Sequence, residues 1–202
     1  MPRRSFPASL GLAAMLVSSH AFATVIVQNI AGTNPNSGTG FFFGQSFTTP
    51  SSGGPWDDIT FNFFTNVPPT TPEAVGNAFL LDQQFLGTPS NLSSSTPGFL
   101  AESTVITGGM HVFSTALELS PGTQYFVYEN AVSPNLSGGN TISGGQLYFA
   151  GSSSDFAGGG RSNNFTVSGD VVSAAVSEPS PLMVLVIALL GFGLLRRYRA
   201  SG

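Results

Sequence analysis

Residues 124–130 read QYFVYEN, a short run in which Tyr125 and Val127 fall on one face and Phe126 and Tyr128 on the other. Side chains of a β-strand alternate between its two faces, and aromatic and β-branched residues are enriched in strands. The run therefore predicts a strand. Because other parts of the chain repeat the same pattern, it also indicates the fold class.

The period of two recurs across the body of the chain. Residues 57–64 (DDITFNFF) alternate Ile59, Phe61 and Phe63 with polar side chains, and residues 114–120 (STALELS) alternate in a similar way. Further predicted strands are residues 24–30, 41–49, 77–85, 99–107, 145–151 and 163–172. About nine short strands separated by turns rich in Gly, Pro, Ser and Asn predict an all-β fold, an antiparallel β-sandwich or jelly roll.

The composition limits partners and chemistry. Only 8% of the residues are charged, against about 25% in a typical soluble domain. Between residues 24 and 176, Arg161 is the only arginine or lysine, and nine acidic residues give this body a formal charge of −8. Such a body cannot neutralise phosphates, which excludes nucleic acid as a partner. The absence of cysteine excludes disulfides, thiol nucleophiles and thiolate metal sites.

The first 23 residues, MPRRSFPASLGLAAMLVSSHAFA, have the layout of a secretory signal peptide. Arg3 and Arg4 form a positive region, an apolar stretch follows at residues 10–17, and Ala21-Phe22-Ala23 fits the small-x-small cleavage rule. We predict general secretion through the translocon, with signal peptidase cutting after Ala23. The alternative interpretation is an uncleaved amphipathic helix.

A second apolar segment, Leu182–Leu195, contains no polar residue and is followed by Arg196, Arg197 and Arg199. As a helix it would measure roughly 21 Å, short of a hydrocarbon core of about 30 Å. Snorkelling arginines and local thinning of the bilayer make a short span acceptable. Positive residues on the cytoplasmic side would leave the body outside. The segment predicts a single short transmembrane helix, with a plain stop-transfer anchor as one alternative and a buried core helix as another.

The residues before this span sharpen the interpretation. Ser177-Glu178-Pro179, the short Leu- and Gly-rich span and the arginine cluster together resemble a PEP-CTERM sorting signal of exported bacterial proteins. The resemblance implies that a membrane transpeptidase, an exosortase, recognises and processes the tail near the motif. Ser177 departs from the family pattern, which has proline there. The chain then divides into a signal peptide (1–23), a β-sandwich domain (24–176) and a sorting signal (177–202).

The body carries a weaker resemblance. Residues 44–50 (GQSFTTP) followed by DDITFNF, and residues 117–130 (LELSPGTQYFVYEN), are similar to strands of carbohydrate-binding-like jelly rolls that often accompany such tails. In fibronectin type III and immunoglobulin-like sandwiches, a stretch like the second forms a tyrosine corner. That resemblance implies the corner role for Tyr125.

Catalytic candidates are few. His111 is the only histidine of the body, and no Gly-x-Ser-x-Gly elbow accompanies it. We therefore interpret His111 as a satisfied strand or turn histidine, expect no enzymatic activity, and expect no cofactor. Asp57 and Asp58 form the only adjacent acid pair. They fit a solvated turn, oxygen ligands of a Ca²⁺ ion, or acids of a glycan hydrolase.

Two further residues or pairs invite functional interpretations. Trp56, the sole tryptophan, follows SSGGP and either stacks on a sugar ring or caps the core beneath the loop. Asp155 and Arg161 either pair across a glycine turn or are simply exposed. For Asp155, as for Asp57, a role as an oxygen ligand and a solvated turn remain open.

The sequence thus favours a non-enzymatic exported protein. We expect a precursor held transiently in the inner membrane with its body outside the cytoplasm. The mature protein would lie at the cell surface or in an extracellular polysaccharide matrix, with a structural or adhesive role in a biofilm. The alternatives are a secreted carbohydrate-binding module that contacts exopolysaccharide, a simple membrane-anchored surface protein without processing, and an acid-dependent hydrolase.

Overall fold

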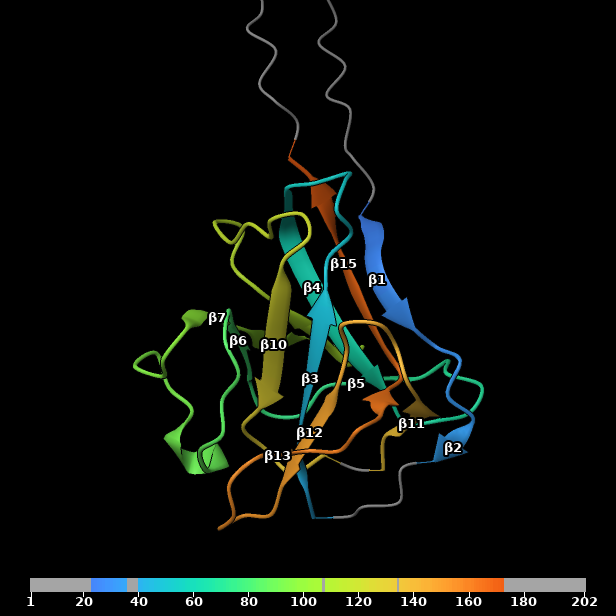
Figure 1. Cartoon of the computed structure of the whole chain (residues 1–202), viewed down its shortest axis with the longest axis vertical. Coiled ribbons are helices and arrows are strands. Elements are labelled where there is room, and N and C mark those ends of the chain that lie inside the picture. Colours follow the sequence, from blue (N-terminus) through green and yellow to red (C-terminus); the bar gives the residue numbers. More distant parts are fainter. Residues whose placement is uncertain (1–22, 36–39, 107, 134, 173–202) are drawn as a thin grey trace, which may run out of the picture.

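A computed structural model of the chain describes residues 23–35, 40–106, 108–133 and 135–172 (Figure 1). These residues form antiparallel strands and one short 3₁₀ helix, which confirms the all-β prediction. The sorting motif, the predicted transmembrane segment and all of the predicted signal peptide except Ala23 lie outside the described residues. Within the described ranges, no helix is both long and apolar enough to cross a membrane.

Two six-stranded sheets make up most of the domain. The first sheet contains, in spatial order, β1 (Thr24–Asn29), β15 (Phe165–Val171), β4 (Trp56–Phe64), β9 (Met110–Val112) and β8 (Thr104–Ile106), and β5 (Pro72–Glu73) also pairs with β4. The second contains β13 (Ala157–Gly158), β12 (Leu147–Ala150), β3 (Phe42–Thr48), β10 (Gln124–Glu129), β6 (Ala78–Leu81) and β7 (Phe99–Glu102). A small third sheet joins β14 (Ser162–Asn163), β11 (Ser137–Asn140) and β2 (Asn34–Pro35), and the 3₁₀ helix η1 spans Pro89–Asn91.

The main core lies between the two large sheets, in a sandwich-like arrangement. Phe61 of β4 stacks on Phe165 of β15 at a centroid separation of 5.8 Å, and Phe47 of β3 reaches Phe61 from the second sheet at 6.4 Å. All three rings are 0% exposed. Phenylalanine is therefore the main filler of the core, because each ring removes a large apolar area from water.

A second core covers the opposite face of the second sheet. Tyr128 and Tyr148 lie on that face, and Phe85 and Phe156 pack over them from the 82–98 and 151–156 segments. The Tyr128 hydroxyl accepts a hydrogen bond from the Phe85 backbone N–H at 3.1 Å. Residues on both faces of β10 are thus buried, which explains why QYFVYEN carries aromatic side chains on both faces.

The predicted tyrosine corner is present. The Ser120 backbone N–H donates to the Tyr125 hydroxyl at 2.8 Å, five residues along the chain. The predicted strand at residues 114–120, however, is wrong: the chain turns there through a Leu117 N–H to Ser114 carbonyl hydrogen bond. Leu119 forms only an isolated bridge to Trp56. The alternation of the buried Leu117 and Leu119 therefore comes from a loop folded onto the core rather than from a paired strand.

Other strand boundaries also differ from expectation. The strand predicted over residues 77–85 ends at Leu81, and residues 99–107 divide into β7 and β8 of different sheets, with Ser103 at the crossing. The sequence did not predict β9, which pairs with both β4 and β8. These short strands place His111 at the junction of the two sheets.

The first and last strands of the described domain are neighbours. β1 and β15 run antiparallel, and Thr24 is the partner of Gly169. The chain therefore enters β1 and leaves β15 at the same end of the sheet (Figure 1). This end is called the exit pole below.

Candidate functional site

A chain of polar side chains crosses the interior between the two sheets. The Ser103 hydroxyl lies 3.0 Å from His111 Nδ1, and His111 Nε2 lies 2.9 Å from Glu129 Oε1. Ser103 belongs to the crossing between β7 and β8, His111 to β9 of the first sheet, and Glu129 to β10 of the second. The three side chains are almost completely buried, at 2%, 0% and 0% exposure.

The hydrogen bonds have a consistent direction. The Ala78 backbone N–H donates to the Ser103 hydroxyl oxygen at 2.8 Å, so the hydroxyl hydrogen is free to donate to His111 Nδ1. His111 then carries its hydrogen on Nε2 and donates it to the Glu129 carboxylate. In this arrangement both ring nitrogens of His111 are hydrogen-bonded, and the chain of polar groups ends on the buried carboxyl group of Glu129.

Burial governs the acidity of Glu129. Loss of solvation raises the pKa of this carboxyl, the hydrogen bond and charge of His111 and the Val75 N–H oppose the rise, and the charge of Glu73 adds to it. The Val75 N–H lies 3.4 Å from Oε1, the same oxygen that contacts His111. Oε2 has no hydrogen-bond partner within the described part of the chain. The folded protein therefore holds a proton on Glu129 more tightly than an exposed glutamate would.

The connectivity serine–histidine–carboxylate is that of hydrolytic triads. A nucleophile, however, must reach its substrate, and the Ser103 oxygen is buried while it accepts the Ala78 N–H. The hydrogen bonds among these side chains instead link the segment between β7 and β8 to β9 and β10 across the domain. His111 is a strand residue with both nitrogens hydrogen-bonded, which agrees with its structural interpretation from the sequence.

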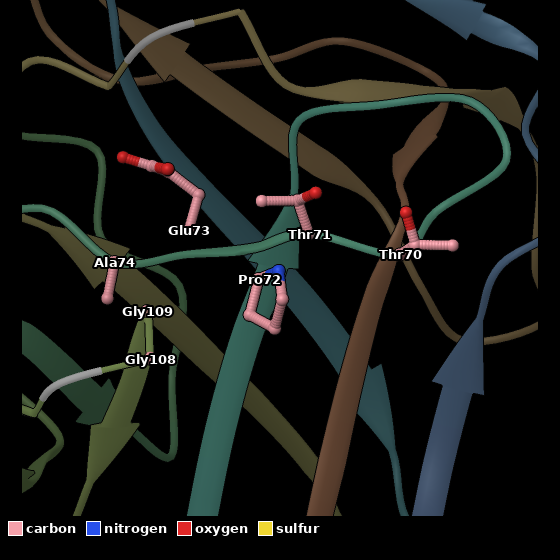
Figure 2. Close-up of a pocket in the computed structure, with 7 residues that line it drawn as sticks. All are labelled: Thr70, Thr71, Pro72, Glu73, Ala74, Gly108 and Gly109. Atoms are coloured by element: carbon pink, nitrogen blue, oxygen red, sulfur yellow. The ribbon is translucent and has the colours of Figure 1, made fainter.

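An open recess of about 550 Å³ lies beside this polar chain. Residues 70–74 form one wall, and Gly108 and Gly109 form the other (Figure 2). The Asn66 side-chain oxygen accepts the backbone N–H groups of Thr70 and Thr71, both at 2.9 Å, and so shapes the first wall. Gly109 has a φ of 72°, and an added Cβ would lie 2.3 Å from the Pro72 carbonyl oxygen. Only glycine fits this contact between the walls.

Trp56 lies away from the recess and is 4% exposed. It is part of the main core and lies under Gly54, where an added Cβ would stand 2.5 Å from the indole ring. Its backbone exchanges two hydrogen bonds with Leu119, at 3.0 and 2.7 Å. With so little of its ring accessible, Trp56 takes the core-capping role rather than presenting a surface for a sugar.

The acidic candidates are distributed along strands and loops. Asp57 and Asp58 do not form a turn before the strand but lie inside β4, at an irregularity where Asp58 has a φ of 48° and Asp57 pairs with Asp170. Asp155 and Arg161 are both exposed, and no ion pair joins them. Across the ranges that the structure describes, no three histidine or carboxylate side chains converge on a metal position.

Sequence reasoning did not bring Ser103, Glu129 or the recess into the candidate site. The only sequence signal for this site was His111 itself, because a buried histidine needs hydrogen-bond partners. Which residues are its partners depends on the order of the strands in space, which the spacing of residues along the chain does not give. No protein-family model, curated protein or solved structure matches this chain. The site must therefore be interpreted from its own geometry.

Proposed function

We propose that this chain is the precursor of an exported, exosortase-processed protein that is deposited at the cell surface or in an extracellular polysaccharide matrix. The observation that carries the proposal is the three-part tail: Glu178-Pro179, the short apolar span Leu182–Leu195 and the arginine cluster. The body would serve a structural or adhesive role as a carbohydrate-binding-like sandwich. Its partners would be the translocon, signal peptidase and exosortase, with transient membrane contact.

The arrangement of the domain supports this proposal. The chain leaves β15 at the exit pole, and Ser177 follows only five residues after Val172. Five extended residues span at most about 17 Å, so the motif would lie close beneath the exit pole. The signal peptide would join β1 at the same pole, because Thr24 lies opposite Gly169. Both targeting segments would then hold the precursor at one end and leave the other end facing outward.

The test is to express the full chain in a host with an active exosortase and in the same host without it, and to measure the mass of the product. We expect the exosortase-dependent loss of the segment beyond the Ser177–Pro179 motif. Replacing Glu178 and Pro179 by alanine should abolish the loss, whereas replacing Ser180 by alanine serves as a matched control. An intact tail in both hosts would show a simple anchored protein and overturn the proposal.

A further inference from the structure

An exposed pair of aromatic rings lies at the end of the domain opposite the exit pole. Phe41, immediately before β3, and Phe149 of β12 are each 37% exposed, and their rings meet edge to face with centroids 5.9 Å apart. β3 runs from this end towards the exit pole, where Trp56 is the partner of Val171 (Figure 1). The end that holds the pair is called the distal pole below, and it is the end that would face outward in the proposed export topology.

The pair continues two rows of core side chains into solvent. Side chains two positions apart on a strand share a face, so Phe41 lies in line with the buried Phe43 of β3, and Phe149 with the buried Leu147 of β12. Gly159 lies beside Phe149, where an added Cβ would stand 3.4 Å from the ring and 3.2 Å from Leu147. Because glycine has no side chain to lay over it, the Phe149 ring stays open. The pair is thus an accessible extension of the core rather than two unrelated surface residues.

The size of the open surface limits its partner. A buried phenylalanine removes about 150–250 Å² from water, so two residues of which about a third is open offer on the order of 150 Å². Each partner of a stable protein complex contributes about 800 Å². The pair is therefore too small to hold a second copy of the chain by itself, whereas it suits the face of a single sugar ring. The distal pole also points away from the bilayer in the proposed topology, which removes a lipid surface as the partner.

Uncharged polar groups stand beside the rings. Ser133 is the antiparallel partner of Phe41, and directly opposed residues share a face. The Ser133 side chain is buried, and its hydroxyl has no hydrogen-bond partner within the described part of the chain. Ser152 and Ser153 are exposed in the turn that follows β12. An apolar platform beside unused hydroxyls suits a pyranose ring, whose CH groups form an apolar face and whose hydroxyls lie at its rim.

We propose that Phe41 and Phe149 form a contact site for a neutral polysaccharide, in which the CH face of a sugar unit packs on the open rings. A ligand hydroxyl that enters beside Phe41 would complete the missing hydrogen bond of Ser133. An acidic polymer is disfavoured, because residues 24–176 carry nine acidic residues and a single arginine. The inference names the partner of the proposed adhesive body and rests on that function for its outward placement. One sugar contact is weak, and many copies on a surface bind a polymer through multivalency.

The experiment is affinity electrophoresis of the full chain in detergent, in native gels that each contain one polysaccharide. The neutral probes are dextran, laminarin and galactomannan, and the acidic probe is alginate. We expect at least one neutral polysaccharide to retard the protein, and alginate not to do so. Retardation by none of the neutral probes, or by alginate alone, would overturn the proposal. Because the purified chain is tested without an exosortase, the sugar contact can fail while the proposed export holds, and the reverse.

Single variants locate the contact. Phe41→Ala and Phe149→Ala should each raise the apparent dissociation constant about tenfold, because each removes one of the two rings. Leu100→Ala is the matched control, since Leu100 of β7 is 38% exposed and lies outside the pair, and it should bind as the native protein does. Gly159→Ala keeps both rings but covers part of Phe149, so it should also weaken binding, and it decides if circular dichroism shows the Phe variants unfolded.

Two results would refute the site. One is retardation that is unchanged in the folded Phe variants, or in Gly159→Ala if the Phe variants do not fold. The other is a concentration-dependent dimer of the native chain that the same variants abolish, because this would identify a second copy as the partner of the pair.

Discussion

The hydroxyl of Tyr125 accepts a hydrogen bond at 2.8 Å from the backbone N–H of Ser120, five residues earlier in the chain. The ring of the same tyrosine lies in the main core, with its centroid 5.9 Å from that of Phe47. One side chain thus fixes the turn before β10 and fills the interior behind it. The corner also sets where β10 begins, and hence the position of Glu129 at its other end.

We expect Tyr125→Phe to lower the free energy of unfolding by about 1–2 kcal/mol, because it keeps the ring but leaves the Ser120 N–H without its partner. Denaturant unfolding followed by circular dichroism measures the change. Ser120→Ala is the matched control, since the backbone group that donates the bond is retained, and it should stay within about 0.5 kcal/mol of the native protein. Equal stability of Tyr125→Phe and the native protein would contradict the role of the corner.

Trp56→Ala should lower the free energy of unfolding by about 3–5 kcal/mol, because it removes a large buried ring from beneath the Gly53–Pro55 loop. The measurement is again denaturant unfolding, with circular dichroism as the signal because Trp56 is the only tryptophan. The intact indole should be poorly quenched by iodide until the protein unfolds. A stable Trp56→Ala variant that loses only sugar binding would contradict the buried position.

His111→Ala should lower the free energy of unfolding by about 1–3 kcal/mol, because it removes the buried hydrogen bonds that the ring makes to Ser103 and to the Glu129 carboxyl group. Replacing both His111 and Glu129 by leucine removes both members of the hydrogen bond and fills their space with apolar side chains, so this double variant should recover most of the loss. The two Leu single variants and the double variant form a double-mutant cycle whose coupling energy reports the pair. Simple additivity of the two single changes would show that the hydrogen bond between them contributes little.

The strands with regular alternation could be predicted from the sequence. A period of two in the aromatic and β-branched residues predicts β4, β10 and β15. Residues 114–120 repeat in the same way, yet they fold as a loop because two buried leucines at this spacing also suit a segment laid over the core. The short strands β2, β5, β9 and β13 carry too few residues for any period to appear.

The candidate site was less predictable for a different reason. Ser103, His111 and Glu129 are close only because β9 and β10 belong to facing sheets. The sequence predicted two packed sheets but not which strands lie opposite each other, so it gave His111 no partners. Glu129 is the last residue of an apolar and aromatic strand. A carboxylate at the end of a strand suggests a solvent-exposed position, but the packing of the two sheets buries this one.

The position of β15 determines how the domain would carry mechanical load. β15 lies between β1 and β4, so the chain that continues beyond Val171 is attached to an inner strand rather than to an edge. Inter-strand hydrogen bonds run perpendicular to antiparallel strands, and a pull along β15 therefore strains both ladders in parallel. A domain held by this end resists drag with two full rows of hydrogen bonds at once, whereas a pull between Thr24 and Val171 opens the β1–β15 ladder one bond at a time.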